Sequence, residues 1–177
     1  DNALCSINGQ PTVSGPGWSS MITGVWYDKH GISDNSFSGS NFNQYPPFNI
    51  LLDESGEIFN TASFIMWTPI HTEIFNGTMD YNEIHTNFDG SVAQGAADYI
   101  STEELDILFL DFDHIDHTGH SYGYGPDIPE YINTIEDVDE YIGWVISAME
   151  SRFNFENEEW LVIITSDHGG NISGHGG

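Results

Sequence analysis

The sequence predicts an α/β fold in which a mainly parallel sheet is flanked by helices, and three segments support this prediction. Residues 105–112 (LDILFLDF) and 160–165 (WLVIIT) are short apolar runs that are typical of buried strands. Between them, apolar residues recur at intervals of three and four, which indicates an amphipathic helix. A strand, a helix and a second strand in succession form a parallel crossover unit. We therefore expect one domain of this class over residues 1–177.

The remaining elements follow from similar patterns. The crossover helix is expected to begin near Pro129, because proline suits the first turn of a helix. Residues 61–66 predict a further strand, and residues 28–60, which are rich in Gly, Ser, Asn and Pro, predict a loop. Another helix is expected from about Pro16 to about Trp26, with Met21, Ile22 and Val25 facing inward. The inward face of the crossover helix is predicted to consist of Tyr131, Ile135, Val138, Ile142, Val145 and Met149.

The composition excludes several classes of partner. Only 2 basic residues stand against 28 acidic ones, for a net charge of −26, which disfavours nucleic acid and anionic membranes. Such a surface also disfavours phosphate-rich substrates unless bound divalent cations supply positive charge. Adaptation to high salt, or solubility alone, would explain the overall charge equally well. No apolar run reaches the roughly 18 residues of a membrane span, so we expect none.

The cysteine content and the first residue indicate where in or outside the cell the protein is found. Cys5 is the only cysteine, which excludes a framework of intrachain disulfides. Asp1 is not an initiator residue, so we expect that a leader has been removed and that the protein is secreted, periplasmic or extracellular. The sequence leaves the oligomeric state open.

Two clusters of Asp and His follow the two predicted strands. DFDHIDHTGH (111–120) begins at the end of the first strand, and Ser166-Asp167-His168-Gly169 follows the second. Ligands of open α/β sheets bind at the carboxyl ends of the strands, so the clusters should converge. Asp116 with His120, where Gly119 would allow a tight turn, and Asp167 with His168 are ligand types that suit zinc. Two zinc ions roughly 4 Å apart could clamp the oxygens of a phosphoryl transfer. The alternative is that these residues are solvated loop groups and a helix cap.

A candidate nucleophile lies near the start of the chain. In PTVSGPGWSSMITG (11–24), Ser14 precedes Gly15 and Pro16, where a helix is expected to begin. The amino end of a helix has free N–H groups and positive potential, which suit a bound phosphate. The alternative is that Ser14 is an ordinary helix cap.

The longer segment PTVSGPGWSSMITGVWYDKHGISDNSF resembles the nucleophile segment of the type I phosphodiesterase/nucleotide pyrophosphatase branch of the alkaline phosphatase superfamily. The resemblance implies that Ser14 is the nucleophile and that Asn35 binds phosphate. It also implies two divalent metal ions, most simply Zn²⁺, and a covalent phosphoseryl intermediate. The matching positions are Ser14, Thr23-Gly24, His30-Gly31-Ile32 and Asn35 in the first segment, Asp116 and His120 for one metal, and Asp167 and His168 for the other.

The chain departs from this family in ways that leave alternatives open. The family carries a further metal-binding Asp on a first strand before the nucleophile, whereas only 13 residues precede Ser14. We therefore expect an incomplete sheet and a missing ligand for one metal. His175 is the candidate for the third ligand of the other metal, and a mobile glycine-rich tail is its alternative. Thr12 is an alternative nucleophile.

The expected activity is hydrolysis of a small phosphoric ester at a two-metal site. The scarcity of cations favours diesters over monoesters, since Lys29 and Arg152 are the only basic residues and Arg152 is expected at the end of the crossover helix. A phosphoethanolamine-type transferase and a non-catalytic module that retains a metal site remain alternatives. A sulfatase is disfavoured because Ser14-Gly15-Pro16-Gly17-Trp18 lacks the arginine of the sulfatase motif.

Overall fold

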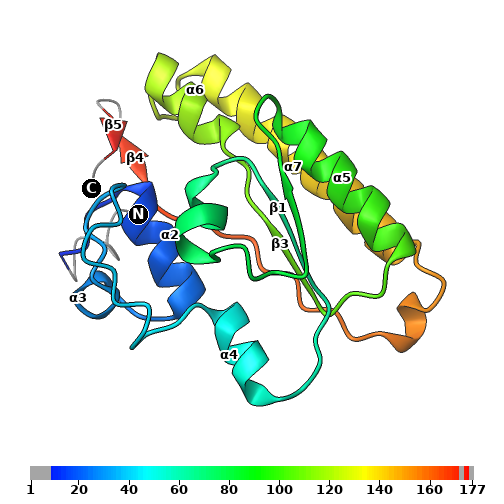
Figure 1. Cartoon of the computed structure of the whole chain (residues 1–177). Helices are drawn as coiled ribbons and strands as arrows, with labels where there is room; N and C mark the ends of the chain where they lie inside the picture. Colours follow the sequence, from blue (N-terminus) through cyan, green and yellow to red (C-terminus); the bar gives the residue numbers. More distant parts are fainter. Residues whose placement is uncertain (1–8, 172–173, 176–177) are drawn as a thin grey trace.

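The computed structural model describes residues 9–171, 174 and 175, and it shows three parallel strands in one sheet with helices around it (Figure 1). The strand order is β2-β1-β3, with β1 (Thr61–Ile65) in the centre, β2 (Tyr81–Ile84) on one side and β3 (Ile107–Leu110) on the other. Every residue of β1 is buried. This arrangement confirms the predicted α/β fold class.

Helices lie on both faces of the sheet. One face is covered by α5 (Asp89–Thr102) and α7 (Pro129–Glu150), which pack side by side, and the other by α2 (Ser14–Thr23) and η1 (Ile70–Ile74) (Figure 1). Side chains of a strand alternate between the two faces, so Ala62 and Phe64 join the core beneath α5 and α7, while Ile65 joins the core beneath α2. The helical elements are α2 (Ser14–Thr23), α3 (Tyr27–His30), α4 (Phe48–Ser55), the π-helix η1 (Ile70–Ile74), α5 (Asp89–Thr102), α6 (His114–Tyr122), α7 (Pro129–Glu150) and the 3₁₀-helix η2 (Phe155–Asn157).

The helix predicted between the two apolar runs and two of the three predicted strands are confirmed, but the crossover is not, because its second strand is absent from the described residues. α7 begins at Pro129 as expected, and Val138, Val145 and Met149 are buried on its inner face, whereas Ile135, which was also predicted to face inward, is 38% exposed. The strands β1 and β3 fall within the predicted ranges. A short antiparallel pair, β4 (Gly170–Asn171) and β5 (Gly174–His175), follows the second Asp/His cluster.

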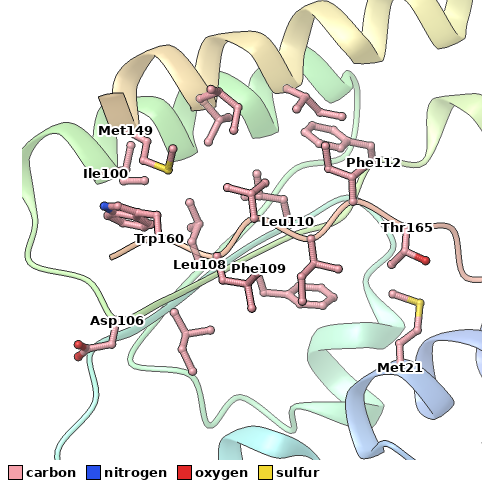
Figure 2. A pocket seen from close by; sticks show the side chains of 18 of the residues that line it. Met21, Ile100, Asp106, Leu108, Phe109, Leu110, Phe112, Met149, Trp160 and Thr165 are labelled. Carbon is pink, nitrogen blue, oxygen red and sulfur yellow. The ribbon is translucent and has the colours of Figure 1, made fainter. Parts of the chain in front are cut away.

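The strand predicted at 160–165 is not present. The segment runs alongside β3 (Figure 2) but forms no strand pairing. The side chains of Leu161 and Ile163 have exposed fractions of 83% and 74%. An apolar run shows only that a segment is suited to burial, whereas a strand also requires a neighbouring edge within hydrogen-bonding distance. That edge is absent from the described part of the chain.

The expected boundaries near the amino end also need correction. The segment 28–60 is not all loop, since it contains most of α3 and all of α4. α2 ends at Thr23 rather than near Trp26, because Gly24 adopts the left-handed conformation (φ +70°) that closes a helix. Ile22 is buried as predicted, but Met21 is 37% exposed and Val25 lies beyond the helix.

Arg152 joins three segments just after the end of α7. Its guanidinium donates to both carboxylate oxygens of Glu158 and to the backbone carbonyls of Ile100 and Glu103, and only 8% of its side chain is exposed. The side chain thus ties the end of α7 to the end of α5 and to the loop before residue 160. Its position matches the charge predicted at the end of the crossover helix.

Replacing Arg152 with methionine is expected to lower the free energy of unfolding by about 2 kcal/mol or more. The substitution removes charge-assisted hydrogen bonds worth about 1.5–3 kcal/mol each and leaves two carbonyls without this donor. Urea unfolding would measure the change. Lys29→Met is the matched control, because Lys29 is exposed on α3 and its loss should change stability by less than about 0.5 kcal/mol. Equal effects of the two substitutions would contradict the prediction.

Candidate active site

Ser14 is the first residue of α2, and its hydroxyl faces the second Asp/His cluster. The preceding residue, Val13, is extended (φ −140°, ψ 149°), so the chain turns into the helix at Ser14. The first N–H groups of a helix have no partner within it and carry positive potential. Ser14 Oγ lies 3.3 Å from His168 Nε2, although the two residues are 154 positions apart. The fold therefore brings the candidate nucleophile beside one of the candidate metal ligands.

Asn35 is held against the same helix end. The backbone N–H of Gly15 donates to Asn35 Oδ1 at 2.7 Å, which fixes the orientation of the amide. An amide that accepts through its oxygen keeps its NH₂ group for another acceptor. The approach is close, since a Cβ at Gly15 would lie 2.5 Å from the backbone oxygen of Asp34. The structure thus brings Ser14 and Asn35 together, with an amide donor near the amino end of α2.

The geometry of His168 determines which of its ring nitrogens carries the proton. Nδ1 lies 3.1 Å from the backbone oxygen of Gly169, which can only accept a hydrogen bond, so Nδ1 is the protonated nitrogen of a neutral ring. Nε2 then presents its lone pair toward Ser14 and lies 3.5 Å from Asp167 Oδ2. An imidazole lone pair beside a carboxylate oxygen suits a shared cation, and metal-binding histidines usually donate their other N–H in this way.

Residues 114–120 of the first Asp/His cluster are helical, which excludes the alternative that they are loop groups. Residues 114–122 form α6, so Asp116 and His120 lie one turn apart on the same face, with His120 Nε2 3.3 Å from Asp116 Oδ2. Gly119 does not make the predicted tight turn. It lies within α6, where a Cβ would be 2.1 Å from the ring of Tyr124.

Tyr124 connects the two clusters, and the sequence analysis missed it. Its ring packs against Gly119 of α6 and against Gly170 in β4, and its hydroxyl donates to Asp116. Burial is the main factor that raises the pKa of the Tyr124 hydroxyl, and the hydrogen bond to Asp116 and the negative charges of Asp116 and Asp167 raise it further. Tyr124 therefore stays protonated and donates to the carboxylate. A tyrosine four residues after His120, in a glycine-rich segment, gives no signal in a single sequence.

Two buried carboxylates support the site from behind. Asp89, which is fully buried at the start of α5, accepts the backbone N–H groups of Asp113 and His114 at 3.0 Å each. It thereby fixes the start of α6, and with it Asp116 and His120. Asp111 accepts the N–H groups of Met66 and Trp67 at the end of β1. Neither role is evident from the sequence.

Asp111 is expected to make stability depend on pH in the metal-free protein. The pKa of the Asp111 carboxyl is raised to about 7, chiefly by burial, against about 3.9 in an unfolded chain. The folded state therefore keeps the Asp111 proton to higher pH than the unfolded chain does. The stability that this proton contributes is fully present below pH ~4 and is lost as the pH rises toward 7, by at most about 1.4 kcal/mol per pH unit.

Asp111→Asn keeps an acceptor oxygen and removes this titration. As the pH rises from 4 to 8, we expect the natural chain to lose unfolding free energy relative to Asp111→Asn. Urea titrations with a chelator present would measure it. Asp139→Asn, on the exposed face of α7, is the control. Parallel pH profiles for the natural chain and Asp111→Asn would contradict the prediction.

His30 of the His-Gly-Ile motif holds the segment behind the site. It is fully buried, its Nδ1 accepts the N–H of Ile32 at 3.1 Å, and its Nε2 therefore donates to Ser20 Oγ at 2.9 Å. Ser20 in turn donates to Gln10, whose amide donates to the backbone oxygen of Pro16. This chain of hydrogen bonds links α2 to His30 and to Gln10.

The side chains of the two Asp/His pairs are chemically suited to bind divalent metal, but they do not form a complete coordination shell. Two Asp/His pairs supply oxygen and imidazole ligands of the kind that zinc binds. Across the side chains that the structure describes, no group of three His, Cys, Asp or Glu residues forms a metal site. The backbone of His175 lies in β5, but its side chain is outside the described residues, so its predicted role stays a prediction.

Comparison with known proteins identifies the family. Residues 6–172 match the family model described as type I phosphodiesterase / nucleotide pyrophosphatase. The chain belongs to this family. The family is part of the alkaline phosphatase superfamily, as the resemblance of the Ser14 segment implied.

Individual relatives agree with this assignment. Human ectonucleotide pyrophosphatase/phosphodiesterase family member 5 is 29% identical over 89% of this chain and 36% of its own length. Bovine bis(5′-adenosyl)-triphosphatase ENPP4 is 27% identical over 89% of this chain and 38% of its own length. The chain thus spans well under half of these relatives.

Solved structures share the fold. Murine ectonucleotide pyrophosphatase/phosphodiesterase 5 superposes with a TM-score of 0.58 at 19% identity, covering 80% of this chain and 42% of its own. An inactive variant of that protein in complex with AMP gives a TM-score of 0.55 at 17% identity, over 84% of this chain and 47% of its own. Within the described residues, no helix is long and apolar enough to cross a lipid bilayer.

Proposed function

We propose that the chain carries the nucleophile and the metal ligands of a phosphodiester hydrolase. The observation that carries this proposal is the convergence of Ser14 Oγ, His168 Nε2 and the amide of Asn35 at the amino end of α2. A nucleophilic hydroxyl, a metal-binding pair and an amide donor are the parts that phosphoryl transfer needs in one place. Family membership supports the same reaction class.

Each residue has a distinct part in the proposed reaction. Ser14 Oγ loses its proton to solvent and forms a bond to phosphorus, the leaving oxygen departs with its electron pair and takes up a proton from solvent, and a phosphoseryl intermediate results. Water then breaks the bond between phosphorus and Oγ and restores Ser14. The NH₂ group of Asn35 and the amino end of α2 stabilise the nonbridging oxygens, on which negative charge builds up.

The two Asp/His pairs are proposed to hold two divalent ions, most simply Zn²⁺. Asp167 and His168 would hold the ion nearer to Ser14, and Asp116 and His120 would hold the other. Bound ions would offset the repulsion between substrate and protein and stabilise the entering and leaving oxygens. Tyr124 keeps Asp116 oriented by donating to it. Where a third ligand is needed, His175 is the proposed source.

The charge of the chain favours a diester of nucleotide type as the substrate. Arg152 is engaged with Glu158 and lies at the end of α7, which leaves no described guanidinium at the site for a second phosphate charge. A diester carries less negative charge than a monoester and suffers less repulsion from a chain with a net charge of −26. The names of the relatives, which include an ectonucleotide pyrophosphatase, support nucleotide diesters or pyrophosphates as substrates and an extracellular location.

Metal removal and a substrate pair test the proposal. We expect the chain to hydrolyse bis(p-nitrophenyl) phosphate faster than p-nitrophenyl phosphate. Chelation with EDTA should abolish this turnover, and added Zn²⁺ should restore it. Elemental analysis of the same samples should show two metal ions per active chain. Turnover that is unaffected by metal removal would contradict the metal assignment, and bound metal without turnover would favour a binding module.

A further inference from the structure

The loop that carries Asn35 begins and closes at His30. Asn35 itself is exposed, whereas Ile32 and Phe37, before and after it, are buried in the core. The ring of His30 accepts the N–H of Ile32 at 3.1 Å, and the backbone oxygen of His30 accepts the N–H of Asn41 at 2.9 Å. The position of His30 therefore determines where this loop leaves the folded core and where it returns.

The other ring nitrogen of His30 is bonded to the helix that carries the nucleophile. Nε2 donates to Ser20 Oγ at 2.9 Å, and Ser20 lies in α2, as Ser14 does. Ser20 Oγ donates to Gln10 Oε1 at 2.7 Å, and Gln10 Nε2 donates to the backbone oxygen of Pro16. The ring is thus connected to the middle of α2 directly and to its first turn through Gln10.

These bonds form a closed network with the contact between Asn35 and the amino end of α2. From the ring, the network runs through Ile32 along the loop to Asn35, whose Oδ1 accepts the N–H of Gly15 at 2.7 Å. It returns along α2 to Ser20, which accepts from the ring. Within the described part of the chain, no other hydrogen bond joins residues 33–36 to α2. His30 therefore supplies the second hydrogen-bonded connection between the loop and the helix.

The network requires a neutral His30 ring with its proton on Nε2. Nδ1 accepts the N–H of Ile32 through its lone pair, which protonation of Nδ1 would remove. Burial lowers the pKa of the His30 ring, although the negative charge of Asp28 opposes this shift. The ring is therefore neutral near neutral pH, and both of its nitrogens keep the bonds described above.

We propose that His30 is a positioning residue for phosphoryl transfer, and that its ring holds Asn35 where the amide can donate to a nonbridging oxygen of the substrate. This inference rests on the proposed function, in which Asn35 stabilises charge that builds up in the transition state. His30 is fully buried and bonded to Ser20 and Ile32, so it acts through Asn35 rather than on the substrate.

Two substitutions separate the two bonds of the ring. In His30→Asn, Oδ1 takes the place of Nδ1, so the acceptor for Ile32 is kept and the donor to Ser20 is lost. In His30→Gln, Nε2 takes the place of the ring Nε2, so the donor to Ser20 is kept and the acceptor for Ile32 is lost. Asparagine is the smaller side chain and leaves the larger cavity, so His30→Asn should destabilise the fold at least as much as His30→Gln.

Turnover should follow the bond to Ile32 rather than stability. For bis(p-nitrophenyl) phosphate, we expect kcat to fall about tenfold or more in His30→Gln and by no more than about threefold in His30→Asn, because a misplaced donor lowers the rate steeply. KM should change by no more than about threefold in either variant, since the lost interaction belongs to the transition state. Urea unfolding of the same samples would give their stabilities.

Asn35→Ala tests the route by which His30 acts. This substitution alone should lower kcat about 10²-fold, as loss of a transition-state donor does. Adding His30→Gln to Asn35→Ala should then change kcat by less than about twofold, because residues of one hydrogen-bond network are not additive. Asn49→Ala is the control for destabilisation. Asn49 is also buried and hydrogen-bonded, to Thr78, but it lies outside the network, so its loss should leave kcat unchanged.

Amide hydrogen exchange measures the same positioning without substrate. The N–H of Ile32 is bonded to the ring and that of Gly15 to Asn35, so His30→Gln should speed exchange at both amides about tenfold or more, and His30→Asn at neither. If exchange follows this pattern in a chain without turnover, the ring still positions Asn35, and it is the proposed reaction that fails. Equal losses of kcat in the two His30 variants, an additive loss in the double variant, or unchanged exchange at Gly15 in His30→Gln would each overturn the proposal.

Discussion

Replacing Ser14 with alanine is expected to reduce phosphodiester hydrolysis by about 10³-fold or more, because the substitution removes the oxygen that attacks phosphorus. Stability should change little, since the hydroxyl makes one contact with His168 at 3.3 Å, worth about 1 kcal/mol at most. Turnover of bis(p-nitrophenyl) phosphate, together with urea unfolding of the same samples, would separate a chemical effect from a structural one.

Ser19→Ala is the matched control for this prediction. Ser19 lies on the same helix and is fully buried, and its hydroxyl has no hydrogen-bond partner among the described residues. Its removal should leave turnover unchanged and should be neutral or slightly stabilising, because an unpaired buried hydroxyl is unfavourable. If Ser14→Ala retained turnover and Thr12→Ala abolished it, the nucleophile would be Thr12.

The elements that the sequence predicted well are those with a strong local pattern. α7 repeats bulky apolar residues at helical spacing, β3 is an apolar run bounded by polar residues, and β1 ends in the apolar pair Phe64 and Ile65. α5 was missed because its buried face consists mainly of small residues, such as Ala93, Ala96 and Ala97. Small side chains give a weak periodicity, yet they allow α5 to pack closely against α7 and β1.

The candidate site shows the same division between local and distant information. The segment around Ser14 and the two Asp/His pairs could be found because each is a short pattern in sequence. The roles of Tyr124 and Asp89 could not be predicted, because their partners come from other elements. Asp89 meets Asp113, 24 residues away, and is identified only by its burial and by the two N–H groups that it accepts.

The failed strand at 160–165 has a different cause. Its composition is that of a buried parallel strand, and the prediction of apolar character was sound. Strand pairing, however, requires two neighbouring segments, and a cavity of about 570 Å³ lies between β3 and this segment. The local pattern therefore indicated that residues 160–165 are suited to a buried strand. Whether they form one depends on a neighbouring strand edge within hydrogen-bonding distance.

Gly17→Ala is expected to lower phosphodiester turnover by about 10²-fold. Gly17 lies in α2, one turn after Ser14, and a Cβ there would lie 2.4 Å from the backbone oxygen of Asp167 and 2.9 Å from its carbonyl carbon. Backbone atoms cannot rotate away from such a contact, so α2 and the Asp167 segment must separate. The 3.3 Å approach of Ser14 to His168 would open with them, and a misplacement of about 1 Å can reduce a rate about 10²-fold.

The same substitution should also destabilise the fold, by about 1–3 kcal/mol from overpacking, against a gain of about 1 kcal/mol in helix propensity. Gly143→Ala separates these two effects, because Gly143 also lies within a helix, α7, but a Cβ there would have nothing within 4 Å. It should stabilise the chain by about 0.5–1 kcal/mol and leave turnover unchanged. If Gly17→Ala behaved like Gly143→Ala in both assays, α2 would not pack against Asp167, and the proposed meeting of nucleophile and metal ligands would lose its structural basis.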